Sequence, residues 1–177
     1  MTRPTRGDGG FTMVEMLVVL VLLAVLAMLA VPGFRGLLLN QRLAAGTGDF
    51  LAALSLARTE ALRRSQSVSV VPLERDWGSG WQVQVRQGGE TTSLRRFEPL
   101  REGVAVDTLG NGFDRAVRYD ANGFAGGSKG INALGCLTLR AETGRRRSIV
   151  IPASGRPKLC DPDKAGDCGL GRCGSQR

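Results

Sequence analysis

The chain reads Gly10-Phe11-Thr12-Met13-Val14-Glu15 near its N-terminus, and sixteen apolar residues follow without interruption as residues 16–31. Residues 11–31 would form a helix about 31 Å long at about 1.5 Å per residue, close to the thickness of a bilayer's hydrocarbon core. The stretch therefore predicts a membrane-spanning helix. Glu15 is its one carboxylate. An acid within a span costs about 2.5–3.5 kcal/mol, so we expect a partner that neutralises it.

The residues before the span are those of a processed leader. Arg3 and Arg6 lie in a short polar segment that ends in Gly9-Gly10, so the small residues precede the apolar run, whereas in a secretory signal they follow it. Together with Phe11, Glu15 and a proline at the end of the span, this arrangement resembles the type IV prepilin signal. The resemblance implies that a prepilin peptidase cuts between Gly10 and Phe11 and methylates the new amine of Phe11.

The resemblance also implies a partner for the acid. In a filament, Glu15 of one subunit would meet the Phe11 amine of its neighbour, so that two charges which are costly to bury would neutralise each other. The alternative is a plain single-pass anchor with an acid near the membrane interface. The cost of that acid makes this alternative the weaker one.

Composition restricts the chemistry of the rest of the chain. The 177 residues include 25 glycines, few aromatic residues (5%) and no histidine. Without histidine the commonest general base and metal ligand are missing, so we expect neither an enzyme nor a cofactor or metal site. The net charge of +8 favours anionic partners, namely nucleic acid, lipid head groups or an acidic protein face.

Helical periodicity continues beyond the span and then changes. Pro32 lacks a backbone donor, so a kink is expected there, and the amphipathic pattern of residues 32–64 ends near Arg64-Ser65. Period-two alternation follows, which is typical of strands. The strands expected are one from 68 to 72, a hairpin of 81–86 and 91–97 around Gly88-Gly89, short strands at 104–106 and 117–119, and a last hairpin of 134–140 and 147–151.

We therefore expect an α+β fold in which a long N-terminal helix packs on antiparallel β-sheets. Its parts are a leader (1–10), the helix (11–64, of which 11–31 span the membrane), a globular β domain (65–160) and a cysteine-containing tail (161–177). The segment Leu54-Ser55-Leu56-Ala57-Arg58-Thr59-Glu60-Ala61, with Trp77 and Gly80-Trp81 after it, resembles the GspH/FimT branch of pilin-like proteins. That resemblance implies the pilin fold and a minor component of a type IV pilus or a type II secretion pseudopilus.

All four cysteines lie late in the chain, at Cys136, Cys160, Cys168 and Cys173. An even number behind an export-type N-terminus predicts two disulfides and an oxidising compartment, which favours a periplasmic C-terminal domain. Of the three possible connectivities we favour Cys136–Cys160 and Cys168–Cys173, because the first would join a strand pair and the second would close a tail loop. A zinc site is the weaker alternative, since the spacings are not those of zinc ligands.

A basic cluster near the last hairpin is the candidate binding surface. Its members could neutralise the phosphates of double-stranded DNA without reading sequence. A solvated or intersubunit face is an equally open alternative. A Gly-Arg-x-Arg-like element before a late cysteine resembles the C-terminal region of FimT-type minor pilins, where it is linked to DNA capture, although Lys158 replaces the second arginine here. The candidate residues are Arg145, Arg146, Arg147, Gly155, Arg156 and Lys158.

The sequence thus favours a minor type IV pilin held in the inner membrane and then inserted into a pilus, with other pilins as partners. The first alternative is a minor pseudopilin of a type II secretion system. The second is a membrane-tethered periplasmic binding domain that never polymerises. Asp161, Asp163 and Asp167 also carry Ca²⁺-type oxygen ligands, but their spacing departs from known Ca²⁺ loops and a solvated tail is the better reading.

Overall fold

The computed structural model describes residues 11–110, 113, 115–126, 135–152 and 154–169. The chain divides into two compact units, Met1–Leu38 and Leu39–Arg177. One helix, α1 (Met13–Arg64), contributes residues to both units. The expected leader, residues 1–10, lies outside the described residues.

Local side chains and turns define both ends of α1. At its start the Thr12 hydroxyl accepts a hydrogen bond from the backbone N–H of Glu15 (3.2 Å), which satisfies one of the unpaired donors of the first turn. At its end, Gln66 N–H donates to the Ala61 carbonyl (3.2 Å) and Ser65 takes a φ of 52°. This left-handed residue closes the helix in a Schellman-type turn. The expected end near Arg64-Ser65 is confirmed.

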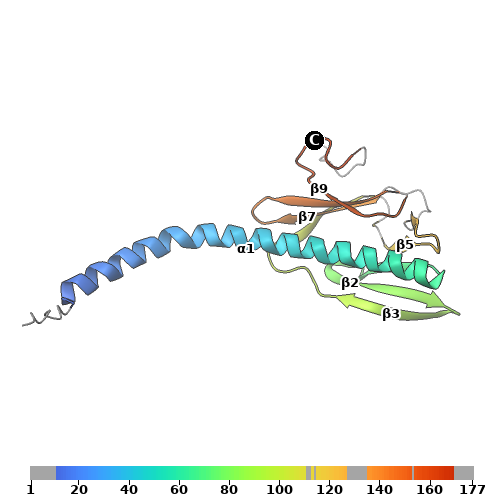
Figure 1. Cartoon of the computed structure of the whole chain (residues 1–177), viewed down its shortest axis with the longest axis horizontal. Coiled ribbons are helices and arrows are strands. Elements are labelled where there is room, and N and C mark those ends of the chain that lie inside the picture. The colour runs from blue at the N-terminus through green and yellow to red at the C-terminus, as the bar shows by residue number, and fades with distance from the viewer. Residues whose placement is uncertain (1–10, 111–112, 114, 127–134, 153, 170–177) are drawn as a thin grey trace, which may run out of the picture. The chain divides into compact units, whose positions relative to one another are not determined.

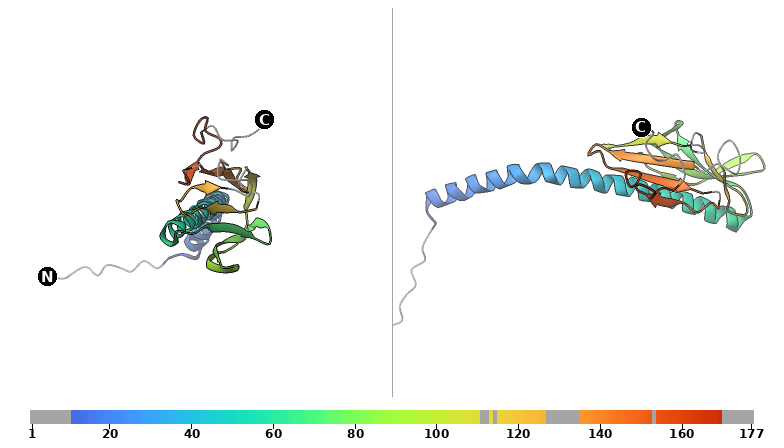
Figure 2. Two further views of the ribbon diagram at one scale, coloured as in Figure 1. Left: turned by 90° about the vertical axis from the view of Figure 1, so that its right-hand side faces the viewer. Right: turned by 90° about the horizontal axis from the view of Figure 1, so that it is seen from above.

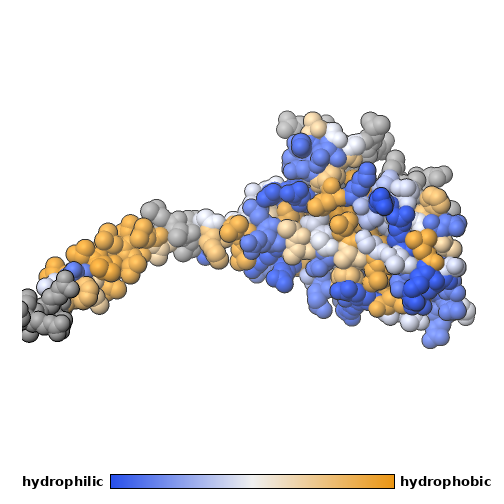
Figure 3. Space-filling model, viewed as in Figure 1, coloured by the Kyte–Doolittle hydropathy of each residue, from blue (hydrophilic) through white to orange (hydrophobic). Residues whose placement is uncertain are grey.

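The apolar first part of α1 has little to pack against within its own unit. Between Met13 and Met28 the large hydrophobic side chains are about half exposed or more, for example Leu20 at 64% and Met13 at 87%. Figure 3 shows them as a continuous hydrophobic stretch along the helix. No single straight helix in the described part of the chain passes as a membrane span, but Met13–Met28 and Gly33–Arg64 together do, bent by 41°. The expected kink residue, Pro32, lies between these two parts.

The second unit contains two antiparallel sheets, which lie along the part of α1 from Leu39 onward (Figures 1 and 2). Sheet A has the strand order β3-β2-β1-β5-β6, and sheet B has the order β4-β7-β8-β9. The strands are β1 (Val68–Leu73), β2 (Asp76–Gln87), β3 (Glu90–Phe97), β4 (Val104–Leu109), β5 (Val117–Tyr119), β6 (Ala125–Gly126), β7 (Gly135–Ala141), β8 (Arg146–Ile151) and β9 (Lys158–Cys160).

The core of this unit joins one face of α1 to both sheets. Phe50 of the helix lies 4.8 Å from the Trp81 ring and 5.1 Å from the Trp77 ring, measured between centroids. Trp77 is anchored by its indole N–H, which donates to the Phe113 carbonyl (2.6 Å). Buried aliphatic residues of sheet B, such as Leu139, belong to the same cluster. The expected α+β architecture, a long N-terminal helix packed on antiparallel β-sheets, is confirmed.

All of the expected strands are present, and the structure adds two short ones. The hairpin at Gly88-Gly89 forms as expected, since both glycines take positive φ (59° and 90°). Two short strands, β6 and β9, have no counterpart among the expectations. Each has two or three residues and pairs with the strand directly before it in the chain, β6 with β5 and β9 with β8. They could not be predicted from the sequence, because two or three residues are too few to show an alternation.

Candidate functional site

The assembly end of the chain is built on the first turn of α1. Phe11 is 81% exposed and precedes the helix. Glu15 lies in the first turn, where the helix dipole favours a carboxylate. Thr12, which caps this turn, was missed by the sequence reasoning. Its signal was present, since Thr12-Met13-Val14-Glu15 has the spacing of a capping box. Gly10, the other expected processing residue, lies outside the described residues.

The expected basic surface is divided between the two ends of β8. Arg145 lies in the hairpin turn before β8 and is exposed, and Arg147 is half-buried at the start of the strand. Lys158 pairs with Val150 near the far end of β8. Five residues of strand separate Arg145 from that position, about 16 Å at about 3.3 Å per residue. The structure therefore does not gather these residues into one cluster.

Arg146 is committed to ion pairs on sheet B. It bonds to the Asp163 carboxylate and lies 3.7 Å from Asp107, which Arg140 also contacts at 3.2 Å. The hydrogen bond from Arg146 lowers the pKa of the Asp163 carboxyl below its ordinary value. Of the four basic residues near this hairpin, Arg146 is thus the least available to an external anion, because its charge already has two carboxylate partners.

Arg156 and Lys158 lie near the other end of β8. Arg156 is on a loop whose position depends on glycine, and Lys158 directly follows that loop as the first residue of β9. Gly155 takes a φ of 75°, and its N–H donates to the Pro152 carbonyl (2.8 Å). A Cβ built on Gly155 would collide with the carbonyl oxygen of Gly123, in the turn before β6. The loop therefore lies directly against that turn, and Arg156 and Lys158 are both exposed.

Two polar groups are buried beneath the Gly123 turn. A Cβ on Gly123 would come within 3.2 Å of the Arg58 Nε atom, so this arginine of α1 packs under the turn. Arg58 Nε and the Tyr119 hydroxyl are both buried without a hydrogen-bond partner in the described structure. Burial raises the pKa of Tyr119, and the charge of Arg58 offsets part of that rise. Arg58 thus belongs to the support of the candidate loop and not to its exposed surface.

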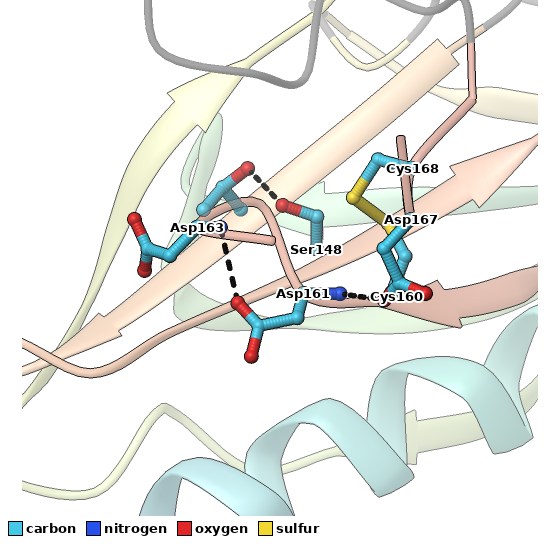
Figure 4. The surroundings of a disulfide bond; sticks show 7 residues. Ser148, Cys160, Asp161, Asp163, Asp167 and Cys168 are labelled. Carbon is cyan, nitrogen blue, oxygen red and sulfur yellow. Dashed lines mark hydrogen bonds between the residues drawn. A yellow bond between two sulfur atoms is a disulfide. The ribbon is translucent and has the colours of Figure 1, made fainter. Parts of the chain in front are cut away.

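The disulfide pairing expected from the sequence is wrong. Cys160 bonds to Cys168, with their Cα atoms 5.1 Å apart (Figure 4). Cys136 is also disulfide-bonded, but not to Cys160. Strand β8 lies between β7, which carries Cys136, and β9, which carries Cys160. Two strand spacings of about 4.8 Å exceed the span of a disulfide, which needs Cα atoms within about 7 Å. Cys173 lies outside the described residues.

The acidic residues of the tail all make hydrogen bonds within the protein. Asp161 N–H donates to the Asp167 carboxylate (2.7 Å), and Asp163 N–H donates to Asp161 Oδ1 (3.0 Å), as Figure 4 shows. Within the described ranges no group of three acidic, cysteine or histidine side chains could hold a metal ion. The carboxylates of Asp161 and Asp167 therefore stabilise a tight loop, and that of Asp163 joins the loop to Arg146 of β8.

Structures of known proteins resemble this fold. The type IV minor pilin FimU of Pseudomonas aeruginosa matches with a TM-score of 0.59, at 21% identity over 73% of this chain and 96% of that one. A second crystal form of FimU gives 0.56, at 21% identity over 71% and 99%. The minor pseudopilin EpsH of the Vibrio cholerae type 2 secretion system gives 0.52, at 13% identity over 70% and 99%. At such identities the likeness concerns the fold alone.

Family models extend the comparison to sequence. None of the curated proteins compared with the chain is a significant match. Residues 5–31 match the prokaryotic N-terminal methylation motif, which contains the Gly10-Phe11 junction and Glu15. Residues 47–155 match the family described as type II transport protein GspH, more than half of the chain. The chain therefore belongs to the GspH family of pilin-like proteins, with an N-terminal methylation motif ahead of the family domain.

Proposed function

We propose that the chain is a minor type IV pilin, a structural subunit and not an enzyme. It would be made as a prepilin, cut between Gly10 and Phe11, held in the inner membrane and then inserted into a pilus. The observation that carries the proposal is the exposed apolar part of α1, residues 13–28. Such a surface is stable in a bilayer or among the helices of other subunits, and a helical filament supplies the second environment.

The electrostatics of the first turn support assembly over simple anchoring. Glu15 is the one ionisable side chain between Phe11 and Pro32. The mature amine on Phe11 of an adjoining subunit would neutralise it, and breaking a buried pair costs about 3–5 kcal/mol. The disulfide Cys160–Cys168 supports a periplasmic location of the second unit, because disulfides persist in oxidising compartments.

A single substitution at Glu15 tests assembly. Glu15→Gln keeps the shape and removes the charge, so we expect at least about tenfold less of the chain in sheared filaments and an undiminished amount in membranes. Glu90→Gln, in the second unit, is the matched control and should assemble normally. Equal incorporation of the Glu15 variant would overturn the proposal. Mass spectrometry of the mature chain should find methylated Phe11. An intact Met1 would favour the tethered, non-polymerising alternative.

The surface proposed for double-stranded DNA is the loop with Arg156 and Lys158. Both side chains are exposed, and no described carboxylate lies within ion-pair distance of either. Gly155 presents them on a loop whose geometry is restrained by Gly123. Of the hairpin candidates, Arg145 and Arg147 remain secondary contributors, and Arg146 is excluded because Asp107 and Asp163 occupy it.

The DNA part is tested by Arg156→Ala with Lys158→Ala in the full chain in detergent micelles. Affinity for a duplex of mixed sequence would be measured at several salt concentrations. Each lost phosphate contact lowers the slope of log affinity against log salt by about 0.9, so we expect a fall of about 2. The matched control removes two exposed arginines elsewhere, Arg75 and Arg101. An unchanged slope would remove this loop from DNA binding.

A second candidate function is that of a minor pseudopilin in a type II secretion system. The name of the matching family, type II transport protein GspH, favours it. Deleting the gene from the host separates the two functions. Loss of pili or of DNA uptake supports the minor pilin. Accumulation of exported proteins in the periplasm with normal pili supports the pseudopilin.

A further inference from the structure

The outward face of sheet A carries an unusual set of side chains. On β1, β2 and β5 one set of alternate residues is buried against the core, including Val68, Val83, Val85 and Val117, and on β3 Phe97 is buried. The other set points away from it and shares rows across the strands, as in Ser69↔Gln84↔Ser93. We call this set the outer sheet face. Its nine members are Ser69, Val71, Gln82, Gln84, Arg86, Thr91, Ser93, Arg96 and Arg118.

The charge of this face has a single sign. Arg86, Arg96 and Arg118 are all exposed, and no carboxylate occupies any of the nine positions. No ion pair joins these arginines to a carboxylate among the described residues. This distinguishes them from Arg140 and Arg146 on sheet B, whose charges are neutralised by acidic neighbours. The three cations on sheet A are therefore available to an external anion.

The polar residues between the arginines form an oriented hydrogen-bond chain. The Ser93 hydroxyl donates to Gln82 Oε1 (3.3 Å), and Gln82 Nε2 donates to Gln84 Oε1 (3.1 Å). These bonds occupy both side-chain carbonyl acceptors and leave the Gln84 amide N–H groups as donors. The centre of the face therefore presents hydrogen-bond donors between cations. Such a pattern suits an anionic acceptor, since serine and glutamine side chains commonly contact phosphate oxygens.

The spacing of the cations indicates an extended anion. Arg118 lies in the same row as Gln84 and two strands away, and Arg86 lies two residues further along β2. Strand spacings of about 4.8 Å and a rise of about 3.3 Å per residue place their Cα atoms about 12 Å apart. Arg96 is about 16 Å from Arg118 by the same geometry. A surface of this extent contacts several charges, as a polyanion backbone provides.

The lack of aromatic side chains on the outer sheet face restricts the class of partner that it can bind. Val71 is the one apolar residue among the nine, and none is aromatic. Protein interfaces are anchored by buried aromatic or large apolar side chains, and single-stranded nucleic acid is held by stacking on aromatic rings. A flat face of arginine, glutamine and serine fits neither. It fits the phosphate backbone of a duplex, which needs cations and donors but no stacking platform.

We propose that the outer sheet face binds the phosphate backbone of double-stranded DNA, independently of sequence and separately from the Arg156–Lys158 loop. The inference depends on the proposed function in one respect only, the choice of double-stranded DNA as the partner. It differs in location, because Lys158 belongs to β9 of sheet B while these arginines lie on β2, β3 and β5 of sheet A. The chain would then hold a duplex through two cationic surfaces.

The experiment uses the full chain in detergent micelles with a duplex of mixed sequence. The variant combines Arg86→Gln, Arg96→Gln and Arg118→Gln. We expect the slope of log affinity against log salt to fall by about 2.7, or about 0.9 for each contact, and Arg118→Gln alone to lower it by about 0.9. The charge-matched control, Lys164→Gln with Arg75→Gln and Arg101→Gln, removes three exposed cations elsewhere and should keep the wild-type slope. An unchanged thermal unfolding midpoint verifies that each variant is folded.

Each result has a defined meaning. If the sheet variant keeps the slope of the control, or if the wild-type chain binds no duplex, the inference is overturned. If the sheet variant binds DNA normally but fails to enter filaments, the outer sheet face is a subunit interface and the inference is likewise overturned. If the sheet variant loses slope while the Arg156–Lys158 variant does not, the inference stands and the loop proposal fails. Loss of slope in both variants supports both surfaces.

Discussion

Gly155 shows how one residue without a side chain positions the candidate DNA loop. Its backbone adopts a φ of 75°, which residues with a Cβ rarely take. It also lies against the carbonyl oxygen of Gly123, where a Cβ has no room. Both constraints act on a loop that carries two exposed cations, Arg156 and Lys158. The loop is therefore specified by backbone geometry, and its charges depend on that geometry for their position.

Gly155→Ala should destabilise the second unit by more than about 3 kcal/mol, because strain at positive φ costs about 1–3 kcal/mol and the collision with Gly123 adds to it. Gly144→Ala is the matched control. Gly144 has a similar φ of 85°, but nothing lies within 4 Å of its added Cβ, so strain alone should apply. Urea unfolding, followed by the fluorescence of buried Trp77 and Trp81, measures both. Equal losses would show that the contact with Gly123 is unimportant.

At the scale of elements, the end of α1 is stabilised by an ion-pair cluster. Glu60 accepts hydrogen bonds from Arg63 (2.7 Å) and Arg64 (2.6 Å), one turn further along the helix. The hydrogen bonds from Arg63 and then Arg64 lower the pKa of Glu60 to about 2. The two arginines also lie in the last turn, where the helix dipole favours cations. The cluster therefore stabilises the helix end through charge while Glu60 is ionised.

The pH dependence follows from the sign of this shift. The folded-state pKa of Glu60 is below its ordinary value of 4.5, so the contribution is complete above about pH 5 and is lost as pH falls toward about 2. Glu60→Gln should therefore be less stable than the wild type at pH 7 and equal to it near pH 2. Urea unfolding across this range measures the difference. Glu90→Gln, which removes a carboxylate with no ion pair in the described structure, should leave the profile unchanged. A constant difference at all pH values would contradict the assignment.

At the scale of the whole molecule, the two units differ in the surface that they expose. The first exposes the apolar side chains of residues 13–28, whereas the buried cluster of the second draws only on residues from Leu43 onward. The stability of the second unit should therefore not depend on the first. This separation suits a subunit that is anchored by one part and presents the other to its surroundings.

Deleting residues 1–38 should leave the unfolding midpoint of the second unit unchanged and remove the need for detergent. Deleting residues 1–43 is the control, because it also removes the fully buried Leu43. Loss of such a side chain costs about 2–5 kcal/mol. Urea unfolding followed by tryptophan fluorescence measures both truncations. If the shorter deletion were as harmful as the longer one, the core of the second unit would extend into the first.

The sequence by itself determined the features that depend on neighbours along the chain. The apolar run, the end of α1 at Arg64, the Gly88-Gly89 hairpin and most strands follow from periodicity and turn chemistry, which are local. The helix cap at Thr12 could also have been predicted, because Thr12 and Glu15 have the spacing of a capping box. Resemblance of short motifs indicated the family, and the matches over residues 5–31 and 47–155 confirm it.

Only the tertiary structure decided which distant residues meet. Strand β8 lies between Cys136 and Cys160, so Cys160 bonds to Cys168 instead. The same arrangement places Arg146 against two carboxylates, separates the basic residues along β8, and assembles Arg86, Arg96 and Arg118 on one face of sheet A. Strand order and register set these contacts, and neither is encoded in the spacing of residues along the chain.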